Sequence, residues 1–213
     1  MVANHAAIEA ALSRARVSTY FNALKPPPAM DRALALYVWN AHLAAALMVP
    51  LSICEVVIRN AAADALALRY GGNWPSSPAF RGSLRQRGRD ALDGAVRKHP
   101  AAGKVIAELT FGFWQQLFTG AFDGALWKPY LYTVLPRLPR VLTVQAARAH
   151  IFAELEALRL VRNRIAHHEP LLVENVPDAV LRAARLVDLR CADTMAWLQA
   201  SHGVDALLNS RPD

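Results

Sequence analysis

The segment Leu160–Pro170, LVRNRIAHHEP, brings together two arginines, an asparagine, two adjacent histidines and a glutamate. A histidine titrates near neutrality, so it can give or take a proton in a transition state. An arginine beside it can hold a phosphodiester and stabilise the charge that develops on its oxygens. Because RNA supplies its own nucleophile in the 2′-OH, Arg162 and His167 form a minimal set for metal-free RNA cleavage. The products of that reaction are a 2′,3′-cyclic phosphate and a 5′-OH.

The spacing of Arg162 and His167 decides whether they can act together. On an ideal helix their side chains point about 140° apart, whereas Asn163 shares a face with His167. The pair converges only if the helix ends or distorts near Ala166. Pro170 favours such an end, because it disfavours helical geometry at the residue before it and has no backbone N–H.

The residue types of this segment can also arise without catalysis. In a chain this rich in arginine, an Arg-x4-His pair is expected about half the time by chance. Basic residues at a helix C-terminus also complement the helix dipole and cap free carbonyls. A metal site built from His167, His168 and Glu169 is disfavoured, because adjacent side chains diverge and no distant pattern completes the ligand set. We therefore expect neither a metal nor a cofactor.

The hydrophobic pattern is helical through almost the whole chain and predicts an all-α fold. We expect helices over residues 6–23, 32–49, 52–70, 83–98, 103–109, 144–164 and 177–201. The one strand-like piece, YLYTVL, is flanked by prolines and is expected in a loop with short helical turns. We predict one domain over residues 1–202 and a flexible tail over residues 203–213.

Polar residues near the expected helix starts indicate two N-caps. Asp31 can accept the free backbone N–H groups of a helix that begins at Arg32. Pro50 interrupts that helix, and Ser52 with Glu55 then has the spacing of a capping box that opens the next one. The capping box is an ordinary structural role for Glu55.

The composition suits one globular core and an anionic partner. The chain has 213 residues, of which 54% are hydrophobic, and this is enough for a core without disulfides. A net charge of +7 and an isoelectric point of about 9.9 favour attraction to polyanions. Nearly all of the positive charge is arginine, which suits phosphate binding. The coding bias of a high-GC genome accounts for the arginine content equally well.

We expect a cytoplasmic protein without a membrane partner. The first residues lack a basic region followed by an apolar core, so no signal peptide is expected. Cys54 and Cys191 lack CxxC spacing, which indicates buried thiols in a reducing compartment. Residues 33–54 are long enough to span a bilayer, but polar residues and Pro50 interrupt them, which favours a buried helix.

The segment LVRNRIAHHEPL resembles the Arg-Asn-x-x-x-His signature of HEPN-superfamily ribonucleases. It looks closest to the Abi-like (abortive infection) branch, whose motif is RNRxAHHEP. Two upstream segments, LSICEVVIRNAAADALALRYGGNW and LTFGFWQQLF, also resemble elements of that family, so the resemblance covers roughly residues 30–175.

This resemblance implies a HEPN-like helical bundle, here with additional N-terminal helices, and a homodimer whose two motifs face each other. It implies a metal-independent endoribonuclease toxin in phage defence or a toxin–antitoxin system, with RNA as substrate and a protein or RNA antitoxin as partner. Carried over, Arg162 is the motif arginine, Asn163 the polar residue after it and His167 the motif histidine. His168 is the second histidine of the Abi-like motif. The alternative is a non-catalytic HEPN module that binds RNA or protein.

Glu55, Arg59 and Asn60 are candidates for supporting roles in the same site. Glu55 and Arg59 lie one turn apart on one helix face, with Asn60 adjacent to Arg59. A carboxylate there can pair with Arg162 and aim its guanidinium. The capping box and an i,i+4 ion pair account for Glu55 and Arg59 without any function.

Further residues have the chemistry of RNA contacts. If residues 83–98 extend one helix, Arg81, Arg85 and Arg89 form a basic stripe that can grip phosphates, and Arg164 is a fourth candidate. A solvated helix surface accounts for the stripe equally well. The aromatic cluster can stack on bases but is favoured as core, and it consists of Phe111, Phe113 and Trp114.

Overall fold

The computed structural model describes residues 4–99 and 101–212, and every regular element within them is helical. The first half contains α1 (His5–Leu12), α2 (Arg14–Phe21), α3 (Met30–Tyr70), η1 (Trp74–Ser76), α4 (Pro78–Ser83), α5 (Gln86–Lys98) and α6 (Ala102–Glu108). The second half contains α7 (Phe111–Leu117), η2 (Gly120–Phe122), η3 (Asp123–Trp127), α8 (Lys128–Val134), α9 (Val144–Ala166), α10 (Val176–Asp188), α11 (Ala192–Ser201) and α12 (Val204–Asn209). The predicted all-α class is confirmed.

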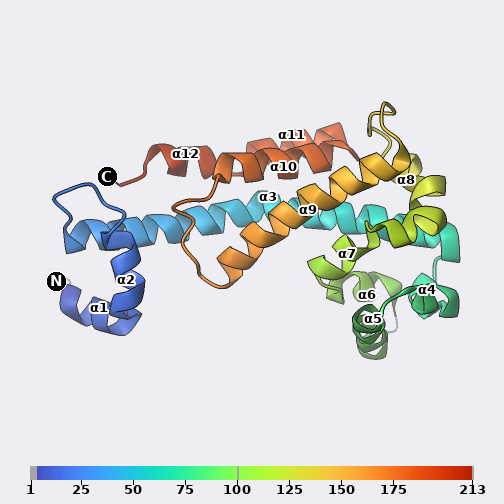
Figure 1. Ribbon diagram of the computed structural model, residues 1–213, viewed down its shortest axis with the longest axis horizontal. Helices are drawn as coiled ribbons and strands as arrows, with labels where there is room; N and C mark the ends of the chain where they lie inside the picture. Colours follow the sequence, from blue (N-terminus) through green and yellow to red (C-terminus); the bar gives the residue numbers. More distant parts are fainter. Residues whose placement is uncertain (1–3, 100, 213) are drawn as a thin grey trace.

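Helix α3 runs along the length of the molecule, and the other helices are arranged around it (Figure 1). The α1–α2 hairpin packs at its N-terminal end, and α4 to α6 lie at its C-terminal end. Helices α10, α11 and α12 follow it along one side, while α9 crosses it obliquely. The long helix α3 therefore positions α9, whose last turn carries the Arg162–His167 segment.

The expected break of α3 at Pro50 is wrong, because the helix continues for 41 residues from Met30 to Tyr70. A proline inside a helix costs about 3 kcal/mol, since it removes one hydrogen bond and crowds the preceding turn. Apolar residues at helical spacing on both sides of Pro50 form one continuous buried stripe, and they include Leu43, Leu47, Leu51, Cys54 and Ile58. Burial of this stripe outweighs the local cost, at roughly 1.5–3 kcal/mol for each large side chain.

The predicted caps of α3 are also wrong, because the helix starts earlier and does not stop. Its N-cap is Ala29, which has no side-chain cap, and Asp31 lies within the first turn. The Ser52 hydroxyl donates to the carbonyl of Val49 at 3.0 Å, as serine does inside a helix. Glu55 therefore has no capping role.

Several further element boundaries differ from the prediction. The helix expected over residues 6–23 divides at Ser13, whose φ of 74° is left-handed, and the one expected over residues 177–201 divides between α10 and α11. YLYTVL begins within α8, where its apolar side chains pack against the core. Within the expected tail over residues 203–213, α12 packs on α3, and the Trp39 indole donates to the carbonyl of Leu207 at 2.7 Å.

The aromatic cluster belongs to the core, as favoured. Phe113 and Trp114 are buried, and Trp114 meets Trp74 edge-on with ring centroids 6.0 Å apart. Phe118 stacks on Trp127 at 4.3 Å. These rings join α7 to η1 and η3, so they fix the framework of the core.

Within the described residues, α3 is the one helix long and apolar enough to cross a membrane. An apolar core helix of a soluble protein meets the same criterion, and 33% of the most apolar window is buried here. The expected lack of a membrane partner stays a prediction.

Asn40 ties α3 to the chain that follows α9. Its side chain is buried, and its Oδ1 accepts a hydrogen bond from the backbone N–H of Leu171 at 2.8 Å. A buried backbone N–H that loses its partner costs about 1–3 kcal/mol. The contact therefore holds the loop after α9 against the spine of the fold.

We expect Asn40→Leu to lower the free energy of unfolding by about 1–3 kcal/mol, because it strands the N–H of Leu171 in the core. Urea unfolding followed by circular dichroism measures the change. His42→Leu, on an exposed position of the same helix, is the matched control and should stay within about 0.5 kcal/mol of wild type. Equal stabilities of the two variants would contradict this role for Asn40.

Candidate functional site

Helix α9 ends at Ala166, where Pro170 predicts an end. His167 is the C-cap, with φ −92° and ψ 9°, and its N–H donates to the carbonyl of Asn163 at 2.9 Å. His168 then takes a left-handed conformation, with φ 55°. This residue turns the chain away from the helix axis, which leaves both histidine side chains exposed.

Arg164 holds the turn that follows the helix. Its guanidinium donates to the carbonyl of Pro170 at 2.9 Å and forms ion pairs with Glu169 at 3.3 Å and Glu174 at 3.1 Å. In addition, its carbonyl accepts the N–H of Glu169 at 2.8 Å. An RNA phosphate at Arg164 would have to compete with two carboxylates, so this arginine is better understood as the clamp of the turn.

Two distant elements also hold the same turn. Arg16, from α2, donates to the carbonyl of the left-handed His168 at 2.6 Å, and Asn40, from α3, binds the N–H of Leu171. Contacts at three points along the turn restrict its backbone more than any single contact would. The backbone at His167 is thus fixed by the whole fold, although its side chain is free.

Arg162, Asn163 and His167 keep their polar groups available. Among the described residues, none of the three side chains makes a hydrogen bond or an ion pair. Arg162 is half-buried, and its Nε is buried without a partner, which is an unfavourable state for a polar atom.

The end of α9 does not bring Arg162 and His167 together within one chain. Because the N–H of His167 still bonds to the carbonyl of Asn163, His167 stays in helical register, and ideal helix geometry then puts its Cβ about 140° around the axis from that of Arg162. Neither side chain lines the cavity at the α1–α2 hairpin or the cavity between α5, α7 and α9. The helix thus ends at Ala166, as Pro170 predicts. This end does not turn the side chains of Arg162 and His167 toward each other.

Glu55 does not contact Arg162. Among the residues that the structure describes, Glu55 forms no ion pair, either with Arg162 or with Arg59 one turn later. The Nε of Arg59 is buried without a partner, like that of Arg162, and Asn60 is exposed. The predicted ion pairs of Glu55 are absent, and a role of Arg59 and Asn60 in RNA binding stays a prediction.

The predicted arginine stripe is divided. Arg81 lies in α4, Arg85 is the N-cap of α5, and Arg89 lies inside α5, because Leu84 adopts an extended conformation and buries its side chain. The guanidinium of Arg81 forms a forked pair with the carboxylate of Asp93, at 2.9 Å and 2.7 Å, and this pair holds α4 against α5. The three arginines therefore do not form one face.

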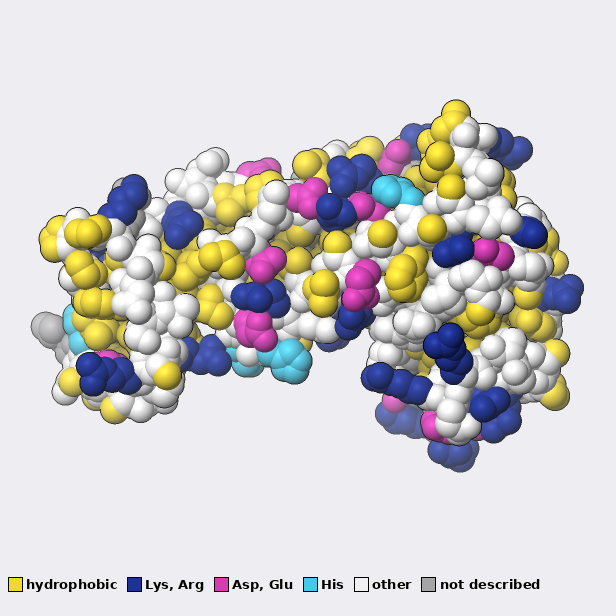
Figure 2. Space-filling model, in the orientation of Figure 1, with side chains coloured by type: hydrophobic (Ala, Val, Ile, Leu, Met, Phe, Trp, Pro, Cys, Tyr) yellow, Lys and Arg dark blue, Asp and Glu magenta, His cyan; other side chains and the backbone are white. Residues whose placement is uncertain are grey.

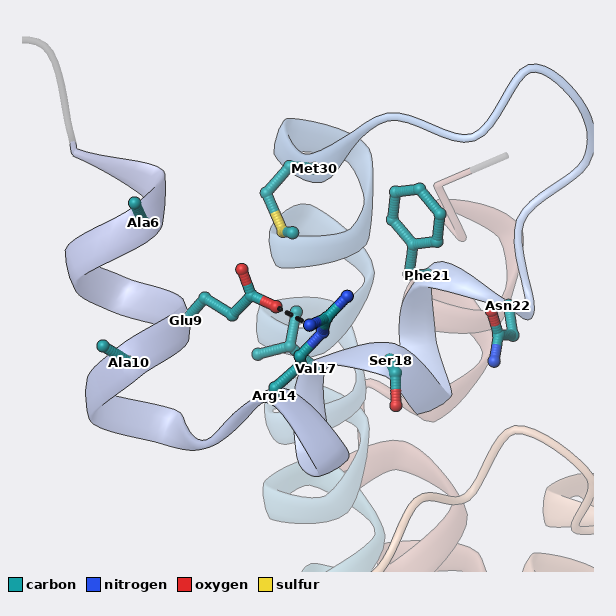
Figure 3. A pocket seen from close by; sticks show the side chains of 9 residues that line it. All are labelled: Ala6, Glu9, Ala10, Arg14, Val17, Ser18, Phe21, Asn22 and Met30. Carbon is teal, nitrogen blue, oxygen red and sulfur yellow. Dashed lines mark ion pairs between the residues drawn. The ribbon is translucent and has the colours of Figure 1, made fainter.

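One cavity, of about 710 Å³, lies between the α1–α2 hairpin and the start of α3. Figure 3 shows Glu9 and Arg14 at this cavity, with their ion pair of 3.9 Å, and Met30 and Phe21 beside them. A second cavity, of about 750 Å³, lies between α5, α7 and the middle of α9. Sequence reasoning missed both: the first depends on how α1 and α2 fold back on the start of α3, and the second joins segments that are distant in the chain.

The described residues contain no group of three or more His, Cys, Asp or Glu side chains arranged to hold a metal ion. Burial raises the pKa of the Cys54 thiol far above its usual range, so it is inert at neutral pH. Cys191 is only half-buried, contrary to the prediction, and a hydrogen bond with the Thr194 side chain lowers the pKa of its thiol. Neither thiol lies at the end of α9.

Comparisons of this chain with protein-family models, curated proteins and solved structures give no match. The HEPN resemblance therefore rests on the sequence segments that carry it. The structure supports the coarser statement, an all-helical protein whose Arg-x4-His segment ends a long helix.

We expect Arg164→Ala to release the turn after α9, because the side chain holds the carbonyl of Pro170 and two carboxylates. Hydrogen–deuterium exchange at the amides of Glu169 and Leu171 should accelerate at least several-fold. Global stability should fall by only about 1 kcal/mol or less, since these ion pairs are partly exposed. Arg162→Ala, two residues earlier and without contacts to the turn, is the control. Unchanged exchange in Arg164→Ala would refute the clamp.

Proposed function

We propose that the protein is a metal-independent endoribonuclease of the HEPN type, with Arg162, Asn163 and His167 as its catalytic residues. The observation that carries the proposal is the state of these side chains at the end of α9. They have no polar partners among the described residues, whereas the neighbouring Arg164 forms ion pairs with Glu169 and Glu174 that hold the turn. Polar groups left unpaired on a well-fixed backbone are suited to a ligand rather than to stability.

The proposed chemistry needs one proton acceptor, one proton donor and a clamp for the phosphate. One imidazole takes the proton of the 2′-OH, the 2′ oxygen attacks phosphorus, and the bond from phosphorus to the 5′ oxygen breaks. The imidazolium formed in this way gives its proton to the departing 5′ oxygen. Arg162 holds the non-bridging oxygens and stabilises their developing charge, and Asn163 orients the phosphate.

A second copy of the chain supplies the missing partner in this scheme. In a two-fold symmetric dimer, Arg162 of one copy can face His167 of the other, although the two diverge within one helix. The dimer then has two composite sites, each with one Arg162 and one His167. The homodimer is a proposal that rests on the resemblance and on this divergence.

The biological setting also rests on the resemblance. It is a cytoplasmic toxin of phage defence (abortive infection) or of a toxin–antitoxin system, restrained by a protein or RNA antitoxin. A nuclease that needs no metal and no cofactor is active as soon as it is released, so restraint by a partner suits this chemistry.

The alternative is a non-catalytic HEPN module that binds RNA or a protein. One observation favours it, namely that Arg162 and His167 diverge in helical register and line neither the cavity at the α1–α2 hairpin nor the one between α5, α7 and α9. Such a module would bind RNA without turnover, and loss of either side chain would lower affinity only.

We expect the purified protein to cleave single-stranded RNA in EDTA and to leave 2′,3′-cyclic phosphate ends. His167→Ala and Arg162→Ala should lower the cleavage rate about 10²–10⁴-fold while remaining folded. His150→Ala, an exposed histidine on the same helix, is the matched control and should cleave at the wild-type rate. Cleavage that persists in both folded site variants would overturn the assignment.

Mixing the two inactive variants tests the composite site. If Arg162 and His167 act across a dimer, a mixture of Arg162→Ala and His167→Ala regains about a quarter of wild-type activity. Random pairing makes half of the dimers mixed, and each mixed dimer has one intact site. If the mixture stays inactive after subunit exchange, the two residues do not act across an interface.

A further inference from the structure

The second cavity, of about 750 Å³, has the features of a binding site separate from the end of α9. It lies between the α4–α5 junction on one side and α7, η2 and the middle of α9 on the other. Its volume is within the range of small-molecule sites, which are mostly apolar with a few placed polar groups. Arg162 and His167 do not line it.

Aromatic side chains form the apolar part of this cavity. Phe113 of α7, Phe122 of η2 and Phe152 of α9 all contribute to its lining. Phe113 and Phe122 are almost wholly buried, at 8% and 6% exposure, so the core holds their rings in place. Fixed aromatic rings around a cavity favour a flat, aromatic ligand group.

A polar network, buried at Gln115 and partly exposed at Arg159 and Glu156, meets the aromatic part. Gln115 is 2% exposed, and its amide nitrogen donates to the carboxylate of Glu156 at 2.5 Å. Arg159 donates to the same carboxylate at 2.9 Å and 2.6 Å. These hydrogen bonds, first that of Arg159 and then that of Gln115, lower the pKa of Glu156, so it is ionised and its charge is balanced by Arg159.

Gln115 and Glu156 can bind the edge of a ligand ring that carries hydrogen-bond donors and acceptors. Among the described residues, the amide oxygen of Gln115 has no hydrogen-bond partner, and the carboxylate of Glu156 has further acceptor positions. Donors and acceptors beside aromatic rings match the edge and the face of a nucleobase. A purely apolar ligand would remove water from these polar groups without replacing its hydrogen bonds, which is costly.

Two arginines at the mouth add an uncompensated positive charge. Arg85 and Arg87 are exposed, line the cavity, and make no hydrogen bond or ion pair within the described part of the chain. Their neighbours differ, since Arg81 is paired with Asp93 and Arg89 with Gln86. Lys and Arg side chains gather over the lobe that contains α5, at the lower right of Figure 2. An arginine pair of this kind suits a phosphate.

We propose that this cavity binds a nucleotide. The base lies among the three phenylalanines, its edge meets Gln115 and Glu156, and its phosphate is held by Arg85 and Arg87. A free mononucleotide and one nucleotide of a single-stranded RNA share this chemistry. The proposal is independent of the proposed nuclease site, because it uses none of the residues at the end of α9.

Calorimetric titration of the His167→Ala protein tests the proposal without turnover. The probes are the four 5′-mononucleotides, the matching nucleosides, inorganic phosphate and a short single-stranded RNA. At least one mononucleotide, or the RNA, should bind. A bound mononucleotide should bind about 10-fold or more tightly than its nucleoside, because the phosphate adds charge-assisted hydrogen bonds to arginine. Absence of binding by every nucleotide and by the RNA at millimolar concentration would overturn the proposal.

Variants of the lining locate the site. Joint replacement Arg85→Ala with Arg87→Ala should weaken binding about 10-fold or more, and exposed side chains of this kind are replaced without unfolding. Phe152→Leu should weaken it about 5-fold or more through lost stacking. Arg97→Ala, exposed on the same helix but outside the cavity, should have no effect.

The two sources of the nucleotide give different patterns. If a mononucleotide binds and displaces no RNA, the ligand is a free nucleotide. If the RNA binds and is weakened by the same cavity variants, the ligand is part of an RNA strand. Binding of either probe that the arginine and Phe152 variants leave unchanged would overturn the assignment to this cavity.

Discussion

The continuous burial of one face of α3 is the constraint on which the remaining structure depends. The helix passes through Pro50 because apolar residues on both sides of the proline pack against the surrounding helices. Its 41 residues then give α9, α10 and α12 a common surface. Buried Glu154, paired with Arg182 and Arg185, links α9 to α10 beside that surface. The end of α9 owes its place to this framework rather than to local sequence.

The polar residues at the end of α9 are divided between structure and function. Arg164 is used to hold the turn, and the left-handed His168 is held through its carbonyl by Arg16. Arg162 and His167, by contrast, have no partners among the described residues. In the proposed nuclease, the first group fixes the backbone and the second meets the substrate. The divergence of Arg162 and His167 makes a second copy of the chain part of the same proposal.

Local signals in the sequence predict some features of the fold and of the candidate site, but not others. The all-α class and the end of α9 follow from periodicity and from Pro170, which act within a few residues. The continuity of α3 through Pro50 does not follow from such local signals. The sequence shows the cost of a proline inside a helix, whereas the burial that offsets this cost comes from contacts with distant helices. The division of the arginine stripe depends on the burial of Leu84, and the second cavity depends on three separate segments, residues 83–91, 110–122 and 152–159. Both are tertiary properties that residue spacing does not encode.

The central claim is that the end of α9 cleaves RNA through His167. Expression of the wild-type chain beside His167→Ala at equal protein levels, with growth and the chemistry of cellular RNA ends recorded, tests it most directly. The account predicts growth arrest and new 2′,3′-cyclic phosphate ends with the wild-type chain, and neither with the variant. Equal growth and equal RNA ends in the two cultures, or arrest that survives the loss of His167, would contradict it.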